Sequence, residues 1–266
     1  MVNLYQAAAN IDSIEKLAMQ DTGIHRLHPM AKLTTTFFYV VIVISFPISN
    51  VSGLVPFLIY PIIIMALSQT PYKPLFKRLL IALPFALMGG ISNLIFMRGT
   101  AFTIGTFAVS NGLVSFVSIL LKTLLCVLAI LILIATTTFV DISHQLAHLR
   151  LPKIICLQFV MTYRYISVLL GEVVSMYTAY SLRAPDIKGI KLKDMGSFLG
   201  QLILRSFDRA DQVYQAMKCR GFEGVYFGRT RHGYYFSDYA YMFLIIAAML
   251  FLRFFNFSTF LGNIVR

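Results

Sequence analysis

Two arginines stand at matching places near the ends of two long stretches with helical periodicity. Arg183 is followed by Ala184 and Pro185, and Arg220 is followed by Gly221, so a helix breaker comes soon after each arginine. One interpretation is helix capping, since a cation in the last turn of a helix contributes about 0.3–1 kcal/mol. The other is docking, because a planar, permanently charged guanidinium at a helix tip can enter an acidic groove of a partner protein. The candidate docking residues are Arg183 and Arg220 with their neighbours Leu182, Ala184, Cys219 and Gly221.

Histidines offer a second possible chemistry. His144 and His148 are four residues apart and share a helical face, so with Asp141 they could bind a metal ion. Apolar residues in the same short helix favour a simpler role, in which the helix rests on the membrane or on the long helices. His25 and His28 lie in a polar segment before the first apolar run and are expected at the membrane surface. The three cysteines form no C-x-x-C pair, so the sequence indicates neither a disulfide framework nor a zinc knuckle.

The composition sets the fold class. Hydrophobic residues make up 58% of the 266 residues and charged residues 13%, whereas about 45–50% and about 25% are usual in soluble domains. Such a chain has too little polar surface to cover a soluble core, and it is too hydrophobic to be disordered. The net charge of +12 could suggest nucleic acid, but in an apolar chain it is typical of cytoplasmic loops that follow the positive-inside rule. We predict an all-α polytopic membrane protein.

The chain offers about five segments that could cross a bilayer, each close to the ~20 apolar residues that a membrane helix needs. No Asp or Glu occurs in residues 22–140. Pro47, Asn50 and Gly53 divide the longest apolar run into two spans. A Thr-, Phe- and Gly-rich stretch at 101–109 predicts a short external hairpin or loop. The expected spans are residues 33–49, 51–68, 79–97, 116–138 and 239–257.

Basic residues predict the orientation. Lys and Arg concentrate in residues 1–32, 69–78 and 140–237, so these segments are expected in the cytoplasm, with the N-terminus inside and the C-terminus outside. Lys122 is the one charge within the first four spans; we favour snorkelling toward the outer face over contact with another membrane subunit. The predicted organisation is a cytoplasmic N-terminal segment (1–31), four transmembrane helices (32–139), a cytoplasmic helical region (140–237), and the last transmembrane helix with the C-terminus (238–266).

The region 140–237 is predicted to hold three helices, at 141–149, 153–183 and 193–220. Apolar residues recur in the second and third with a spacing near 3.6, so each has one buried face. Ala184-Pro185 ends the second helix, and Gly221 is placed as the C-terminal glycine of the third. Charges such as Glu172 and Arg205 would be costly at mid-bilayer, so these two long amphipathic helices are expected along or beneath the membrane.

The two arginine motifs resemble the paired X-Arg-X signatures, often Ala-Arg-Gly, of the T component of energy-coupling factor (ECF) transporters. These are the transmembrane coupling proteins of a class of ABC importers. The resemblance runs from about residue 11 to residue 224. It departs from the family at Leu182 and Ala184, where small residues and glycine are usual, and at Cys219, which replaces alanine. Further stretches similar to the cobalt-type CbiQ subfamily are Leu27-His28-Pro29-Met30-Ala31-Lys32-Leu33, Thr136-Thr137-Thr138 followed by Leu146, Leu149 and Leu151-Pro152, and residues 216–224.

The resemblance implies a mechanism in which this chain is not itself an enzyme. Two ABC ATPase subunits would bind ATP, and the tips at Arg183 and Arg220 would insert into grooves on them. ATPase closure would then move a substrate-binding membrane S component of the CbiM type, with a small accessory membrane subunit as a further candidate partner. No cofactor is expected on this chain, because ATP and the metal ion, cobalt first among the candidates, are handled by partner subunits. The chain itself has no G-x-x-x-x-G-K-[ST] phosphate loop. The expected location is a bacterial or archaeal cell membrane, in contact with lipid.

Three other classes of function were weighed against coupling. A stand-alone secondary transporter or channel usually needs membrane carboxylates or an inverted repeat, and the acid-free stretch argues against it. A membrane enzyme acting on lipids would need an acidic or His/Asp cluster, for which Asp141, His144 and His148 are the nearest candidates. Nucleic-acid binding is disfavoured because the basic residues are spread over loops and mixed with acids.

Overall fold

The computed structural model describes residues 18–48, 51–96, 100–104, 107–148, 151–185, 189–224, 233 and 235–254. The predicted all-α membrane fold is confirmed, with one small β-hairpin added to the helices. The chain forms two compact units. We call Leu17–Thr138 with His232–Arg266 the membrane unit, and Phe139–Arg231 with Met1–Lys16 the amphipathic unit.

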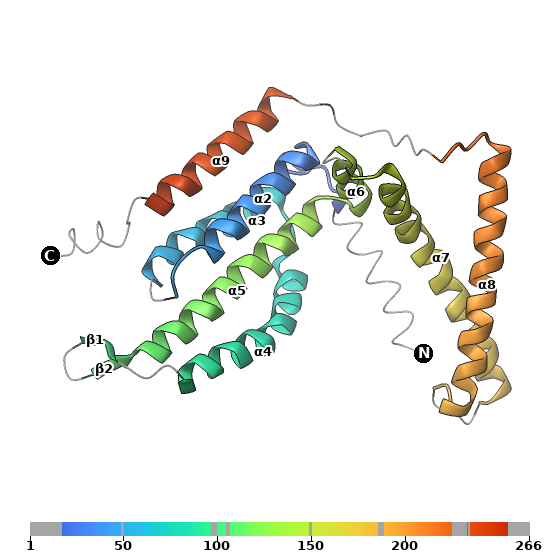
Figure 1. Cartoon of the computed structure of the whole chain (residues 1–266), viewed down its shortest axis with the longest axis horizontal. Helices are drawn as coiled ribbons and strands as arrows, with labels where there is room; N and C mark the ends of the chain where they lie inside the picture. The colour runs from blue at the N-terminus through green and yellow to red at the C-terminus, as the bar shows by residue number, and fades with distance from the viewer. Residues whose placement is uncertain are drawn as a thin grey trace. The chain divides into compact units, whose positions relative to one another are not determined.

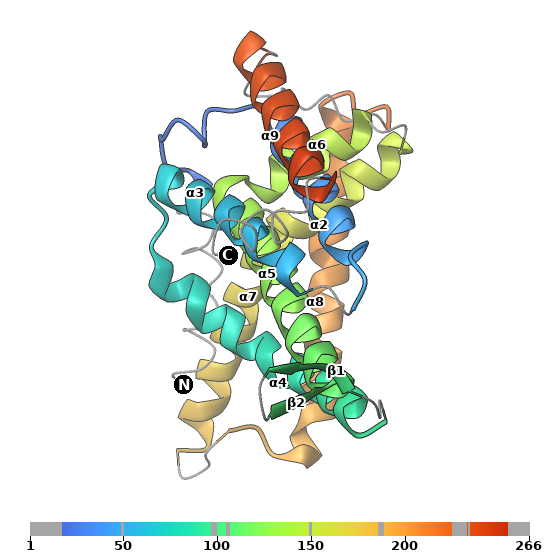
Figure 2. The ribbon, with the colours of Figure 1, turned by 90° about the vertical axis from the view of Figure 1, so that its left-hand side faces the viewer.

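The membrane unit is a group of apolar helices in which α5 is central (Figures 1 and 2). α4 runs along α5, and α2 lies against both α5 and α9. Packing of this kind buries apolar helix faces that a single helix would leave exposed. The elements are α2 (Pro29–Ile44), the 3₁₀ helix η1 (Ser52–Leu58), α3 (Ile59–Ser68), α4 (Tyr72–Phe96), α5 (Asn111–Thr136) and α9 (Phe236–Phe254).

In the described part of the chain, length and composition make four helices candidates for crossing a membrane: Tyr72–Leu94 of α4, Asn111–Thr136, Lys153–Arg183 and Phe236–Phe254. Three of these correspond to predicted spans. The first two predicted spans are shorter apolar helices, Pro29–Ile44 and Ser52–Ser68, because the break around Pro47 ends α2 early. The fourth candidate, α7, belongs to the amphipathic unit and was predicted to lie at the membrane surface.

The predicted hairpin is present between α4 and α5. β1 (Thr100–Ile104) pairs with β2 (Phe107–Ser110) in an antiparallel register. Ser110 ends the hairpin and caps α5, since its hydroxyl accepts a hydrogen bond from the backbone N–H of Gly112 at 3.2 Å. α5 therefore begins at Asn111, ahead of the predicted membrane boundary at residue 116.

The core of the membrane unit gathers around Tyr39 of α2, which has no exposed surface. Its hydroxyl donates to the carbonyl oxygen of Phe57 at 2.9 Å, and its ring stacks on Tyr60 at a centroid distance of 4.6 Å. The opposite surfaces of the helices carry large exposed apolar side chains, such as Phe85 on α4. Helices whose core-facing and outward-facing surfaces are both apolar are expected to face lipid.

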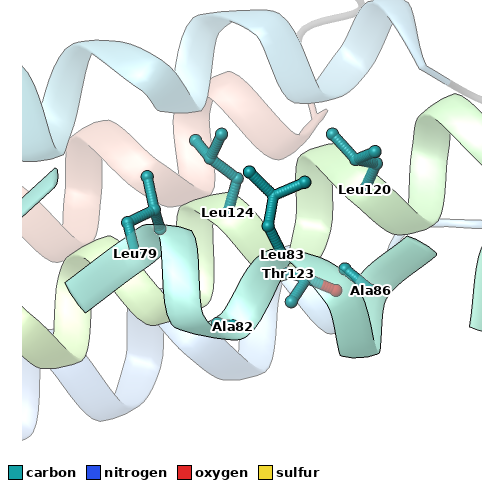
Figure 3. Close-up of a pocket in the computed structure, with 7 residues that line it drawn as sticks. All are labelled: Leu79, Ala82, Leu83, Ala86, Leu120, Thr123 and Leu124. Atoms are coloured by element: carbon teal, nitrogen blue, oxygen red, sulfur yellow. The ribbon is translucent and has the colours of Figure 1, made fainter. Parts of the chain in front are cut away.

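α4 and α5 approach each other closely. A Cβ atom at Gly90 would lie 2.7 Å from the ring of Phe116, so a larger residue there would force that ring to move. Near this contact Leu83, Ala86 and Leu120 help to line a cavity of about 20 Å³ (Figure 3). The one hydroxyl in its wall, on Thr123, already donates to the carbonyl oxygen of Ile119. The cavity is therefore a packing gap without polar groups to hold a ligand.

The amphipathic unit contains α6 (Phe139–His148), α7 (Lys153–Arg183) and α8 (Leu192–Cys219), which confirms the three helices predicted between 141 and 220. α6 packs on α7 through Phe139 and Tyr163, whose rings stack with centroids 4.8 Å apart. α7 buries only Cys156 and Val160, and α8 buries no residue. The predicted buried face of each long helix is thus largely uncovered within the described part of this unit.

Candidate functional site

The first arginine motif closes α7. Arg183 is the last residue of the helix, and the backbone N–H of Ala184 still donates to the carbonyl oxygen of Tyr180 at 3.1 Å. Pro185 follows and cannot extend the helix, since it lacks an N–H donor. The side chain of Leu182 is 78% exposed, and Arg183 is exposed beside it. The tip of α7 therefore presents one apolar and one cationic side chain.

The second motif closes α8 through a left-handed glycine. Gly221 has φ +75°, a conformation that costs other residues energy because of their Cβ atom. Its N–H donates to the carbonyl oxygen of Lys218 at 2.9 Å, and the N–H of Phe222 donates to that of Met217 at 3.1 Å. This pair of bonds is the Schellman motif. Arg220 is the C-cap residue, and it is exposed together with Cys219.

The two guanidinium groups are available to a partner. In the part of the chain that the structure describes, neither Arg183 nor Arg220 makes a side-chain hydrogen bond or an ion pair. Capping by direct hydrogen bonding to the last carbonyls therefore does not occur at either tip. Any dipole contribution acts through space and is screened by solvent. The exposed charges are consistent with both the docking and the dipole interpretation.

Polar contacts brace α7 against α8. The carboxylate of Glu172 accepts a hydrogen bond from Arg205 at 2.9 Å and lies 3.8 Å from a guanidinium nitrogen of Arg209. Closer to the tip of α7, the hydroxyl of Tyr180 donates to Asp194 at 2.8 Å. Donation to this carboxylate raises the pKa of the Tyr180 phenol, so the hydroxyl keeps its proton and its contact at neutral pH. The sequence motifs predicted both helix tips, but they predicted none of these hydrogen bonds and ion pairs between α7 and α8.

The brace places the arginines at opposite ends of α8. α7 ends beside the start of α8, to which a short link joins it (Figure 1). Arg220 follows the far end of the 28-residue helix, about 40 Å away at 1.5 Å per residue. One pair of helices thus carries two separated cationic tips.

Comparison with known proteins decides the family. The family model CbiQ, described as a cobalt transport protein, matches residues 20–234, which include both arginine motifs and their bracing residues. The chain belongs to the CbiQ cobalt transport protein family. The resemblance expected from the motifs is therefore confirmed.

The chain is also similar to proteins from several bacteria. The chain is 28% identical over 224 residues to the energy-coupling factor transporter transmembrane protein EcfT of Bacillus subtilis, covering 79% of this chain and 83% of the relative. It is 25% identical over 270 residues to EcfT 1 of Listeria monocytogenes, covering 90% and 99%. It is 30% identical over 106 residues to the nickel permease LarQ of Lactiplantibacillus plantarum, covering 39% and 38%.

The Leu27–Leu33 motif of this CbiQ-family chain forms a buried polar site that sequence reasoning did not foresee. The buried Lys32 ammonium donates to the carbonyl oxygen of Thr136, at the end of α5, at 2.7 Å. The backbone N–H of His28 donates to the buried carboxylate of Asp238 at 2.9 Å, at the start of α9. The side chains of His25 and His28 are buried within the membrane unit. We call His25, His28, Lys32, Thr136 and Asp238 the inner polar cluster.

Two further cations meet at the opposite end of α2. Lys122 of α5 donates to the carbonyl oxygen of Phe46 at 2.5 Å. Arg253 of α9 donates to that of Ser45 at 3.2 Å, with its guanidinium 4.1 Å from the centre of the Phe46 ring. We call Lys122 and Arg253 the outer cation pair. The sequence predicted snorkelling for Lys122. Its hydrogen bond to the carbonyl oxygen of Phe46, just after α2, is seen only in the structure.

The alternative metal site, Asp141 with His144 and His148, is described only in part. Among the side chains that the structure describes, no group of three or more His, Cys, Asp or Glu residues is placed to hold a metal ion. The side chain of His148 lies outside the described residues, and Asp141 and His144 on α6 have interactions of their own. His232 also lies outside them.

Proposed function

We propose that this chain is the transmembrane coupling subunit of an ECF-type ABC importer for a transition metal ion. In this role it passes the closing movement of two ABC ATPase subunits to a substrate-binding membrane S component. The chain performs no chemistry itself, because ATP and the metal ion are handled by the partner subunits.

The observation that carries the proposal is the pair of exposed guanidiniums at opposite ends of a braced helix pair. A guanidinium provides five donors in a fixed fork that fits a carboxylate. Two such tips about 40 Å apart suit two copies of an ATPase better than one. The brace between Glu172 and Arg205 allows a force on one tip to reach both helices.

Cobalt is the proposed cargo, since the family is described as a cobalt transport protein. The name of one relative, a nickel permease, makes nickel the first competitor. The S component is proposed to be of the CbiM type, with a small accessory membrane subunit beside it. Metal-selective groups then lie on those subunits.

The proposed orientation puts the N-terminus and α6–α8 in the cytoplasm of a bacterial or archaeal cell and the C-terminus outside. α7 is long and apolar enough to span a membrane by composition, but Glu172 near its middle pairs with α8. Burying these charges in hydrocarbon would cost several kcal/mol on insertion scales, so a surface position is favoured.

The docking test is a double charge reversal, Arg183→Glu with Arg220→Glu, in the chain co-expressed with its ATPase and S subunits. Removing one partner of a buried charge pair costs about 2–5 kcal/mol, so the double variant should lose ATPase co-purification while still inserting into the membrane. The matched control is Lys153→Glu with Arg164→Glu, which changes the same charge on exposed positions of α7 far from its tip. Undiminished ATPase co-purification with the tip variant would refute the proposal.

The cargo test measures uptake of cobalt and nickel by liposomes that contain the full transporter. Cobalt uptake should exceed nickel uptake. It should require ATP on the side of the membrane where the ATPases are bound. Metal uptake by this chain alone, without ATPases, would instead support a stand-alone transporter.

A further inference from the structure

The outer cation pair lies at a defined depth in the membrane unit. The inner polar cluster fixes the end of α5 and the starts of α2 and α9 at one level. Lys122 precedes Thr136 by 14 residues and Arg253 follows Asp238 by 15, which places both about 21–23 Å from that level. A hydrocarbon core is about 30 Å thick. With the inner polar cluster at one membrane surface, the pair lies just inside the other, within snorkelling reach of the headgroups.

The outer cation pair keeps unused donors at this depth. Lys122 has three N–H groups and Arg253 has five, yet the hydrogen bonds that hold them engage only the carbonyl oxygens of Ile44, Ser45 and Phe46, at and just after the end of α2. Both side chains are partly exposed. Within the described part of the chain neither forms an ion pair with a carboxylate. Two positive charges beside each other at a membrane surface attract an anion from outside the chain.

An apolar groove adjoins the pair. It has a volume of about 420 Å³ and runs between η1–α3 and α9 within the membrane unit. On α9 it extends from Ala240 to Leu252, about 18 Å along the helix. On the same scale the groove spans about 3–21 Å from the level of the inner polar cluster, so the outer ~15 Å of a 30 Å hydrocarbon core takes in only its end beside Leu252. That end of the groove has the apolar character of an acyl-chain site.

The groove and the outer cation pair adjoin each other through neighbouring residues. Leu252 lines the groove and directly precedes Arg253. Phe57 also lines it, and its ring packs against Phe46 with centroids 5.3 Å apart. Phe46 in turn lies beneath the guanidinium of Arg253 and accepts the bond from Lys122. A molecule with an anionic head and an apolar tail could occupy both features at once.

We infer that the outer cation pair and the groove between α3 and α9 form a binding site for an anionic phospholipid. The phosphate group pairs with Lys122 and Arg253, and one acyl chain lies in the groove. In the proposed orientation, on which only this detail depends, the lipid belongs to the outer leaflet. The bound lipid joins α2, α3, α5 and α9 at the end of the bundle opposite the inner polar cluster.

The test uses the purified full-length chain in neutral detergent, titrated with phosphatidylglycerol or with phosphatidylcholine of the same acyl chains and followed by native mass spectrometry. The wild-type chain should retain phosphatidylglycerol preferentially. Each cation near a membrane surface contributes about 1 kcal/mol toward an anionic lipid. Lys122→Met and Arg253→Met should therefore each weaken binding about fivefold, and the double variant about thirtyfold.

Controls separate the site from general charge and from folding. Lys73→Met with Lys77→Met removes the same charge from exposed positions on α4 and should leave the preference intact. Lys122→Arg and Arg253→Lys keep both charges and should keep the lipid even if the Met variants fail to fold. Equal retention of both lipids by the wild type, or unchanged binding by a folded double variant, would overturn the inference.

The groove has its own pair of variants. Ala248→Phe fills it without touching either cation, and should weaken phosphatidylglycerol and phosphatidylcholine alike. Ala247→Phe adds the same bulk at a neighbouring exposed position that is not part of the lining and should change nothing. Full binding by Ala248→Phe would exclude the groove as the acyl-chain site.

Discussion

The membrane unit and the amphipathic unit differ most in what their helices bury. In the membrane unit, α2, η1 and α5 each contribute fully buried side chains to one core, among them Tyr39, Leu54 and Leu125. In the amphipathic unit, α8 buries no residue and leaves Leu204 and Phe207 mostly exposed. A unit that packs against itself can hold its shape alone. A unit held by a few polar braces depends on partners or a membrane surface to cover its apolar faces.

The largest expected difference between the units comes from removing one aromatic ring in each. Tyr39→Ala deletes a buried ring and its hydrogen bond to Phe57, and should lower the free energy of unfolding by about 3–5 kcal/mol. Phe207→Ala removes a ring that is 67% exposed and should change it by less than about 0.5 kcal/mol. Denaturant unfolding of the purified chain in detergent measures both.

In a second assay, which measures assembly with the partner subunits, Phe207→Ala should have the larger effect and Tyr39→Ala the smaller. Phe207→Ala is expected to weaken assembly with the ATPase or S subunits, because its exposed ring needs a cover that the chain does not supply. A large stability loss from Phe207→Ala in the isolated chain would show that α8 packs internally, and the contrast between the units would fail.

Next in size is the loss of the buried ammonium in the inner polar cluster. Lys32→Met leaves the carbonyl oxygens of Thr136 and His25 without this donor, and unsatisfied buried groups cost about 1–3 kcal/mol. We expect a loss of about 2 kcal/mol, measured as a lower unfolding midpoint. Lys73→Met, at an exposed site in the first turn of α4, is the control and should have no effect. Equal midpoints for the two variants would mean that Lys32 does not hold the end of α5.

Sequence patterns predicted local features of both units well. Apolar runs, Pro47 and the stretch at 101–109 gave the helices and the hairpin, because chain geometry and hydropathy act over a few residues. Gly221 was placed correctly since only a left-handed residue closes a helix in this way. The two arginine tips were found by the same local logic.

What the sequence did not reveal are contacts between residues far apart in the chain. Lys32 meets Thr136 across 104 residues, and Arg253 meets Ser45 across 208. Each is an ordinary cation near an apolar run when read alone, and no periodicity links the two partners. Asp238 carried one readable clue, as an acid at the first turn of an apolar helix. Its partner, the backbone of His28, could not be read from that clue.

A smaller effect is expected at the closure of α8. Gly221→Ala puts a Cβ on a residue with φ +75° and should cost about 1 kcal/mol, fraying the turn that holds Arg220. Hydrogen exchange of the Gly221 and Phe222 amides should become faster, and ATPase binding should weaken. Gly200→Ala, in the middle of α8 with open space around it, should instead stabilise the helix by about 0.5–1 kcal/mol. Faster exchange in both variants would point to general damage rather than to the left-handed turn.

The smallest expected change in stability is at the brace between α7 and α8. Glu172 and Arg205 have half-exposed side chains, and exposed ion pairs contribute about 0.2–1 kcal/mol, so Glu172→Lys should barely alter unfolding. It should still loosen the geometry, because the introduced ammonium would repel Arg205 and Arg209 in a unit that has little buried packing to resist. Distances between spin labels at Leu182 and Lys218, placed in a cysteine-free background, should broaden in Glu172→Lys. The swapped double variant, Glu172→Lys with Arg205→Glu, should narrow them again by restoring opposite charges. Identical distributions in all three proteins would mean that apolar contacts, and not this ion pair, fix the separation of the two arginine tips.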